Sequence, residues 1–594
     1  MRQRLLTLAL FSLFLFALPA FPISGEFMAA DELSRGMRGV GRTVFQGTSI
    51  DSFAVEILGV VHSGLGPRQD LILARLSGGP LAETGIIKGM SGSPVYVEGR
   101  LIGAVAYGWT FSKQPICGIT PIHQMLQVME RDMGPPPVGS RAHAPLELDA
   151  EAAALVREAI PDGELPDAVS LEPLATPVWV AGMTPLAGSI LGEILRPFGL
   201  QVMAAPGGRE EIGAEPLLEP GSPLGVQLIS GDLSATGIGT LTYIDGERIV
   251  GFGHPMMLAG AVDMPMTGAY IYDIIPSQVS SFKIGAATRA VGAIRQDRAQ
   301  AIAGVLGRPP DMLPVAVDIA APDGDSSYRF GIVRHQELIP GLARSVLLSA
   351  LEASEKLFGE ATLELGATIH LSDGRTLDRE QVYSGSVAIL VAALESVRPL
   401  DALVNGPFTM PEVDSLRFSI ALRERITAAG VRSLRVDRAI LEAGDTLAIE
   451  VGLQPYRLQP LAQRVEIPLP ADLAPGELVL RVGSGGLSRT WETQRRPDLL
   501  QPRDGQQLLE LLAVDARDDE LIVELYRSEP GLAIDGRELP GLPPSARAIL
   551  EGATSSGHFE PVHGQVVLRR RVRTDYVLSG EQALKLEVRK PRIR

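Results

Sequence analysis

Short runs of alternating apolar and polar residues dominate the first part of the chain and predict β-strands. Residues 53–57 alternate strictly, residues 71–73 form a short apolar run, and residues 95–97 and 101–107 are two further apolar runs separated by a turn. Alternation turns one face of a strand toward a core and the other toward solvent. The pattern predicts a compact β unit over residues 36–130.

The pattern of apolar and polar residues changes after this unit. The segment Met133–Gly139 holds three consecutive prolines, which a packed element does not accommodate, so we expect a linker there. Near-helical spacing over 148–160 predicts one helix, residues 177–180 predict a strand, and residues 185–199 predict a second helix that ends at its glycine. Together these signals predict a small α/β insert over residues 140–222.

Strand signals return over residues 223–335 and predict a second β unit. They include Gly237–Tyr243, an Asp245-Gly246 turn of the kind that favours hairpins, and the run Ile249–Pro255. This last run carries His254 at a strand end that is rich in glycine.

The remaining pattern predicts three further units. A helix at 342–357 among strands indicates an α+β domain over 336–425, and strict alternation in several later runs favours a β-sandwich over 430–490. One helix near 506–512 and three strands indicate a C-terminal α+β domain over 491–594. The expected fold class is therefore mainly β.

Composition limits the function classes. The chain has 594 residues, of which 45% are hydrophobic and 21% charged, and this predicts several globular domains. A net charge of −16 gives no basic surface for nucleic acid, so we expect no nucleic-acid partner. The single cysteine, Cys117, allows no internal disulfide, and we expect no metal site and no other cofactor.

The N-terminus has the pattern of a secretory signal peptide over residues 1–25. Arg2 and Arg4 precede the apolar run 5–18, and small residues follow it. The alternative is an uncleaved N-terminal membrane anchor. We therefore expect an exported protein, periplasmic or extracellular after cleavage.

The most informative chemistry lies in Gly89-Met90-Ser91-Gly92-Ser93-Pro94, which comes directly before the hairpin of the first β unit. Flanking glycines allow the backbone to turn tightly around Ser91, so the amides of Gly89 and Ser91 could converge on a developing oxyanion. Such a turn is how chymotrypsin-like proteases present a serine nucleophile. The alternative is an ordinary Gly/Ser loop between strands, because these residues dominate turns for conformational reasons alone.

A serine needs a base to become a nucleophile, and the chain offers eight histidines. His254 stands out because Gly251, Gly253 and Pro255 restrain its backbone and leave the ring uncrowded. The alternative interpretation is a structural histidine held by hydrogen bonds.

Three segments resemble the SpoIVB-type serine peptidases (serine peptidase family 55). The Gly-Met-Ser-Gly-Ser-Pro segment with its hairpin carries most of the resemblance, and the other two are residues 237–254 and 291–317. The resemblance implies that Ser91 is the nucleophile and His254 the base, and that the fold contains a chymotrypsin-like pair of β-barrels. In the sporulation peptidase of this family the histidine segment comes first, whereas here Ser91 precedes His254, so the two halves are transposed.

The sequence offers three candidates for the acid of a catalytic triad. In the family the carboxylate lies shortly before the serine, and Asp70 is the nearest upstream aspartate, which makes it the first choice. Asp263 and Asp297, in the second β unit, are alternatives. Asp70 could instead be a turn residue that follows Pro67.

The sequence thus predicts a secreted serine endopeptidase that cleaves protein or peptide substrates by acyl transfer. The competing hypothesis is an exported scaffold or binding protein that retains the protease fold with little or no activity. A third hypothesis is a peptidase that cuts its own chain once. The C-terminal domains could bind a partner in the cell envelope, and the sequence indicates no oligomeric state.

Overall fold

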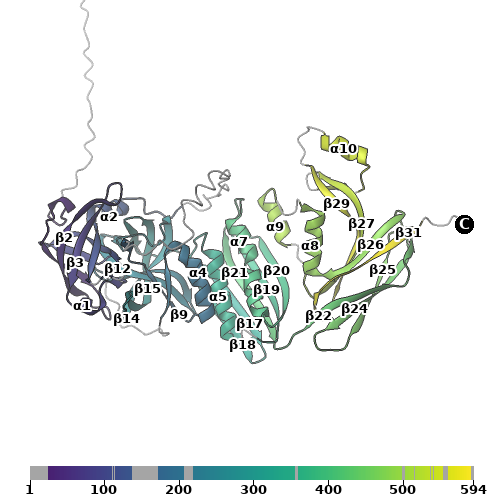
Figure 1. The fold of residues 1–594 in the computed structure, drawn as a ribbon, viewed down its shortest axis with the longest axis horizontal. Helices are drawn as coiled ribbons and strands as arrows, with labels where there is room; N and C mark the ends of the chain where they lie inside the picture. The colour runs from purple at the N-terminus through teal and green to yellow at the C-terminus, as the bar shows by residue number, and fades with distance from the viewer. Residues whose placement is uncertain are drawn as a thin grey trace, which may run out of the picture.

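The computed structural model shows an elongated, mainly β protein in which successive parts of the chain follow one another along the long axis (Figure 1). It describes residues 25–109, 112, 114–136, 171–205, 218–354, 359–497, 502–513, 516–534, 537–539, 541–552 and 559–589. Residues 1–24 of the predicted signal peptide, the predicted helix at 148–160 and the end of the predicted linker lie outside these ranges.

The first β unit is a closed antiparallel barrel of six strands. Its order is β5-β1-β2-β3-β7-β6, and pairing of β5 with β6 closes the ring. Phe53, Val55 and Ile57, the apolar positions of the alternating run in β2, lie buried inside with Ile72 and Leu76 of β3. The strands are β1 (Arg38–Thr43), β2 (Asp51–Gly66), β3 (Gln69–Ser77), β5 (Pro94–Val97), β6 (Arg100–Trp109) and β7 (Ile116–Pro121).

The second β unit is also a closed antiparallel ring of six strands, in the order β12-β13-β16-β15-β14-β11 with β11 paired to β12. The resemblance implied a chymotrypsin-like pair of barrels, and the two rings have this arrangement. The strands are β11 (Pro223–Gly231), β12 (Ser234–Asp245), β13 (Arg248–Gly251), β14 (Gly260–Ile275), β15 (Ser281–Arg298) and β16 (Ala301–Leu306).

The two barrels are joined by apolar packing and by a strand. Helix α2 (Ile122–Met129) buries Ile122 and Met125 against Val250 and Ala303 of the second barrel. The long strand β15 also runs out of its own barrel and pairs in parallel with β4 (Ile87–Lys88), directly before the Ser91 turn. The second barrel therefore holds the segment that leads into the serine.

The α/β insert and the middle domain extend the sheet of the second barrel. Strand β9 pairs with β12, and β10 pairs in parallel with β9 across helix α4, while β18 pairs with β11 and continues the sheet into the middle domain. The elements are β9 (Pro177–Ala181), α4 (Pro185–Leu195), η2 (Arg196–Phe198), β10 (Gln201–Ala204), β17 (Leu313–Ala321), β18 (Gly324–Ile332), α5 (Ile339–Ser354), β19 (Ala361–Leu371), β20 (Thr376–Gly385), α6 (Ala388–Ser396), α7 (Arg398–Asn405) and β21 (Val413–Arg423).

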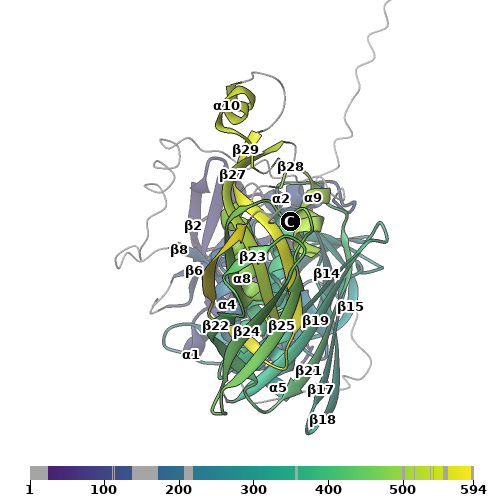
Figure 2. The same cartoon turned by 90° about the vertical axis from the view of Figure 1, so that its right-hand side faces the viewer.

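The C-terminal part is a sandwich of two sheets around one apolar core (Figures 1 and 2). One sheet contains β22, β24, β25 and β30, and the other contains β23, β31, β26, β27, β28 and β29. Strands after residue 490 thus share the core of the predicted 430–490 sandwich, because β27 and β31 flank β26 in one sheet. The elements are β22 (Ala428–Val436), β23 (Ile440–Glu442), β24 (Thr446–Pro455), β25 (Leu461–Pro468), β26 (Gly476–Ser484), α8 (Gly485–Arg495), α9 (Gly505–Ala513), β27 (Glu520–Ile534), β28 (Arg537–Leu539), α10 (Pro544–Gly552), β29 (Phe559–Arg573), β30 (Val577–Ser579) and β31 (Gln582–Arg589).

The predicted fold class is confirmed: the protein is mainly β, with two closed six-stranded rings and further sheets. Within the described residues, no helix is both long and apolar enough to cross a membrane.

Candidate active site

Ser91 lies in a tight turn, residues 89–93, that connects β4 to β5. Two glycines with left-handed backbone make this turn possible, with φ of +93° at Gly89 and +92° at Gly92. Gly92 is also required by space, because a Cβ there would lie 2.0 Å from the Thr240 carbonyl oxygen and 2.5 Å from the Phe252 nitrogen. The serine turn is thus pressed against the second barrel.

Hydrogen bonds fix the Ser91 turn from both sides. Within the first barrel, the amides of Gly92 and Ser93 donate to Val105 O at 2.7 Å and Met90 O at 2.9 Å. From the second barrel, the Thr240 amide donates to Ser91 O at 2.8 Å. The amides of Gly89 and Ser91, the predicted oxyanion donors, are not among the donors of these bonds.

His254 lies in a loop, residues 252–259, between β13 and β14. The loop begins with two residues in left-handed conformation, Phe252 at φ +66° and Gly253 at φ +71°. Phenylalanine rarely adopts this backbone, so packing must hold it there; its side chain is fully buried, and Thr120 Oγ1 of the first barrel donates to Gly253 O at 2.6 Å. Contacts from both barrels therefore set the position of His254.

The His254 ring has a defined tautomer. Its Nδ1 lies 2.7 Å from the Pro255 carbonyl oxygen, which can only accept, so Nδ1 carries the proton and Nε2 of the neutral ring presents a lone pair. Burial lowers the pKa of His254 to about 4, and the carbonyls of Pro255 and Leu174 oppose this shift. The ring is therefore neutral at pH 7, as a general base must be.

Ser91 and His254 lie on adjoining segments of the interface between the barrels. Both residues are almost fully buried, and neither Ser91 Oγ nor His254 Nε2 has a hydrogen-bond partner among the described residues. A buried polar atom without a partner is costly and needs an explanation, of which a catalytic role is one. The structure thus brings the predicted nucleophile and base to one interface without a hydrogen bond between them.

The structure does not bring Asp70 to this interface. Asp70 lies at the start of β3, where its carboxylate accepts from the Ser63 amide at 2.8 Å and lies 3.3 Å from Nδ1 of the exposed His62. These bonds belong to the β2–β3 hairpin, which corresponds to the turn-residue alternative. The nitrogen that a triad acid would bind is occupied by the carbonyl of Pro255.

Of the two alternative acids, Asp297 forms hydrogen bonds with the His254 loop, whereas Asp263 binds elsewhere. The buried carboxylate of Asp297 accepts from the amides of Met256 at 2.8 Å, Met257 at 2.7 Å and Ala259 at 3.2 Å. Asp263 instead forms an ion pair with Arg295 at 2.6 Å. Asp297 is therefore a positioning residue that holds the loop rather than the ring.

Lys283 also lies against the Ser91 turn, although nothing in the sequence around it indicates a functional role. Its side chain is almost fully buried, and a Cβ on Gly89 would lie 3.5 Å from it. Nζ donates to Thr43 Oγ1 of the first barrel at 2.7 Å, and burial lowers the pKa of the lysine to about 7. A lysine in a strand is ordinary in sequence, and only the pairing of β15 with β4 places this one between the barrels.

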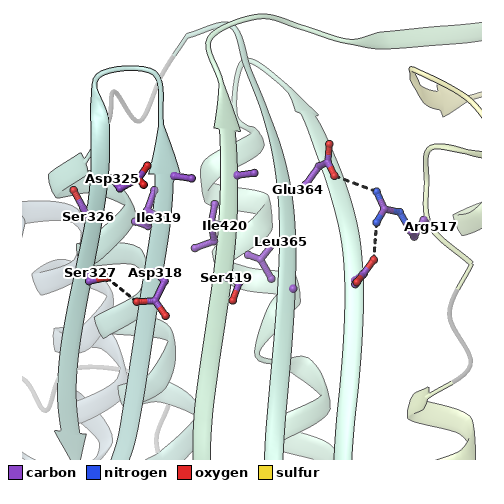
Figure 3. Close-up of a pocket in the computed structure, with 14 residues that line it drawn as sticks. Asp318, Ile319, Asp325, Ser326, Ser327, Glu364, Leu365, Ser419, Ile420 and Arg517 are labelled. Atoms are coloured by element: carbon purple, nitrogen blue, oxygen red, sulfur yellow. Dashed lines mark hydrogen bonds and ion pairs between the residues drawn. The ribbon is translucent and has the colours of Figure 1, made fainter.

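A surface hollow of about 470 Å³ lies elsewhere, on the sheet of the middle domain (Figure 3). Three of its four acidic side chains are already paired: Arg517 binds Glu380 at 2.8 Å and lies 3.6 Å from Glu364, and Ser327 donates to Asp318 at 2.8 Å. The hollow contains no histidine to activate a serine. Across the described residues, no cluster of three or more His, Cys, Asp or Glu side chains could hold a metal ion.

Comparison with known proteins supports the peptidase assignment of the first barrel. Residues 26–126 match the family model described as SpoIVB peptidase S55. The predicted family resemblance is thus confirmed, and the chain carries a SpoIVB-like peptidase region at family level. The match covers Ser91 and ends well before His254. Searches of curated proteins and of solved structures found no match.

Proposed function

We propose that this protein is an exported serine endopeptidase that cleaves protein or peptide substrates through Ser91 with His254 as base. The observation that carries the proposal is the pair of buried, unpartnered atoms Ser91 Oγ and His254 Nε2 at one interface, with the histidine tautomer fixed by Pro255. The peptidase family match to the serine barrel supports it.

Each residue of the site has one role in the proposed reaction. Ser91 Oγ attacks the scissile carbonyl while His254 Nε2 takes its proton, and the amides of Gly89 and Ser91 bind the oxyanion. His254 then gives the proton to the leaving amine, and water hydrolyses the acyl-enzyme with the same base. The Pro255 carbonyl keeps Nδ1 protonated throughout, which is the orienting role that a carboxylate has in a triad.

A neutral carbonyl stabilises the imidazolium less than a carboxylate does, so we expect a slow enzyme. Loss of the carboxylate costs about 10⁴-fold in kcat in a classical triad, while the oxyanion donors still contribute. A slow peptidase suits narrow action on one or a few substrates.

The test is labelling of the full chain with a fluorophosphonate, followed by peptide mapping. We expect slow labelling on Ser91 that is lost in Ser91→Ala and falls at least tenfold in His254→Ala. His123→Ala is the matched control, since His123 lies on α2 and contacts Phe27 rather than the site. A folded wild type without label on Ser91 would instead favour the scaffold hypothesis.

A further inference from the structure

An extended segment, residues 171–176, lies across the edge of the first barrel beside the candidate active site. We call it the strap. Its first part, β8 (Leu171–Pro173), pairs antiparallel with β6 at residues 107–109. The Leu174 amide continues this contact and donates to Ala106 O at 2.9 Å. The strap thus adds a strand beside β6 in the sheet of the first barrel.

The same stretch of β6 binds the serine turn and the histidine loop. Val105 O accepts from the Gly92 amide, one residue away from the carbonyl that binds the strap. On the other side, a Cβ on Gly253 would lie 3.0 Å from the Ala106 side chain. The strap, the serine turn and the His254 loop therefore all contact residues 105–109 of β6, and the Leu174 carbonyl raises the pKa of His254.

The Leu174 side chain fills an apolar site next to the serine turn. It is 8% exposed and packs in the same cluster as Ile87 and Met90, which lead into Ser91. The site borders Gly108, where a Cβ would lie 3.0 Å from Leu174 Cδ2 and 3.9 Å from Ile86 Cγ2. A glycine at this position leaves room for an aliphatic side chain of the size of leucine.

We propose that the strap occupies the substrate groove, and that Leu174 fills the pocket that selects an aliphatic side chain in an extended peptide substrate. An extended peptide adds to a sheet edge through main-chain hydrogen bonds and gains specificity from side-chain pockets, which are the two contacts that the strap makes. The inference rests on the proposed function. It accounts for the burial of both catalytic groups: substrate must displace the strap before it reaches Ser91.

The test compares the rate of fluorophosphonate labelling at Ser91 in full-length variants. In Leu174→Asp a charge cannot stay in the apolar site, so we expect labelling at least tenfold faster than in the wild type. Leu174→Met keeps an apolar side chain of similar volume and should label within twofold of the wild type. Gly108→Ala crowds Leu174 without changing the sequence of the strap. It should therefore also displace the strap and label faster than the wild type.

A peptide with the sequence of residues 170–178 then probes the pocket directly. Added to Leu174→Asp, it should slow labelling, and the same peptide with aspartate in place of Leu174 alone should not. Equal labelling rates in all folded variants, or no competition by the peptide, would overturn the strap proposal while Ser91 remains the nucleophile. No labelling in any folded variant would overturn the proposed function instead.

Discussion

Replacement of Asp297 by asparagine tests whether a buried carboxylate holds the base in place. Asp297 accepts three amide hydrogen bonds from the His254 loop, at 2.8, 2.7 and 3.2 Å. Whichever way the asparagine side chain turns, its NH2 group faces at least one amide N–H of the loop. Hydrogen bonds to a charged acceptor contribute about 1.5–3 kcal/mol each, so we expect Asp297→Asn to lower the free energy of unfolding by on the order of 2–3 kcal/mol.

The same substitution should change the chemistry of His254. A loosened loop admits water to the imidazole, and its pKa then rises from about 4 toward the ordinary value of 6.5. The acid limb of the Ser91 labelling rate should therefore move to higher pH in Asp297→Asn. Asp263→Asn is the matched control, because its carboxylate pairs with Arg295 and not with the His254 loop, so the acid limb should stay where it is in the wild type. Wild-type stability together with an unmoved acid limb in Asp297→Asn would refute the reasoning.

Three further predictions address other parts of the chain. Asp70→Asn should leave Ser91 labelling within about twofold of wild type, because its carboxylate binds only the β2–β3 hairpin; a tenfold loss would restore it as the triad acid. The folded-state pKa of Lys283 is about 7 against an ordinary 10.5, so the unfolded chain binds the extra proton between these values and stability rises with pH there. Denaturant titrations should show a rise on the order of 4 kcal/mol that is absent in Lys283→Met. Glu524 is fully buried between two arginines, and Glu524→Gln should destabilise the sandwich by about 3 kcal/mol in thermal unfolding without changing Ser91 labelling.

The sequence was informative where function constrains the backbone. The glycines around Ser91 and His254 are needed for left-handed turns and for close approach between barrels, and glycine is visible in a sequence. Alternation likewise predicted β2, whose apolar positions are buried. The helix predicted at 185–199 also has a local cause, because it begins at Pro185 and ends before the left-handed Gly199.

The sequence does not predict which segments pair when they lie far apart in the chain. Nothing local in residues 171–176 indicates that they pair with β6, and nothing near Lys283 indicates that β15 leaves its barrel to meet β4. Closeness to Ser91 along the chain favours Asp70 as the acid, but in the barrel Asp70 lies in the β2–β3 hairpin instead. The contact between Asp297 and the His254 loop likewise depends on the pairing of β14 with β15.

The measurement that tests the central claim most directly is the rate of fluorophosphonate labelling at Ser91 between pH 3 and 9, followed by mass spectrometry of the labelled peptide. Only neutral His254 can accept the serine proton, so the rate should be constant at neutral pH and fall as pH drops through about 4. In His254→Ala the rate should be at least tenfold lower and the fall at pH 4 should disappear. Label on another residue, or the same pH profile without His254, would contradict the assignment of Ser91 as a nucleophile activated by His254.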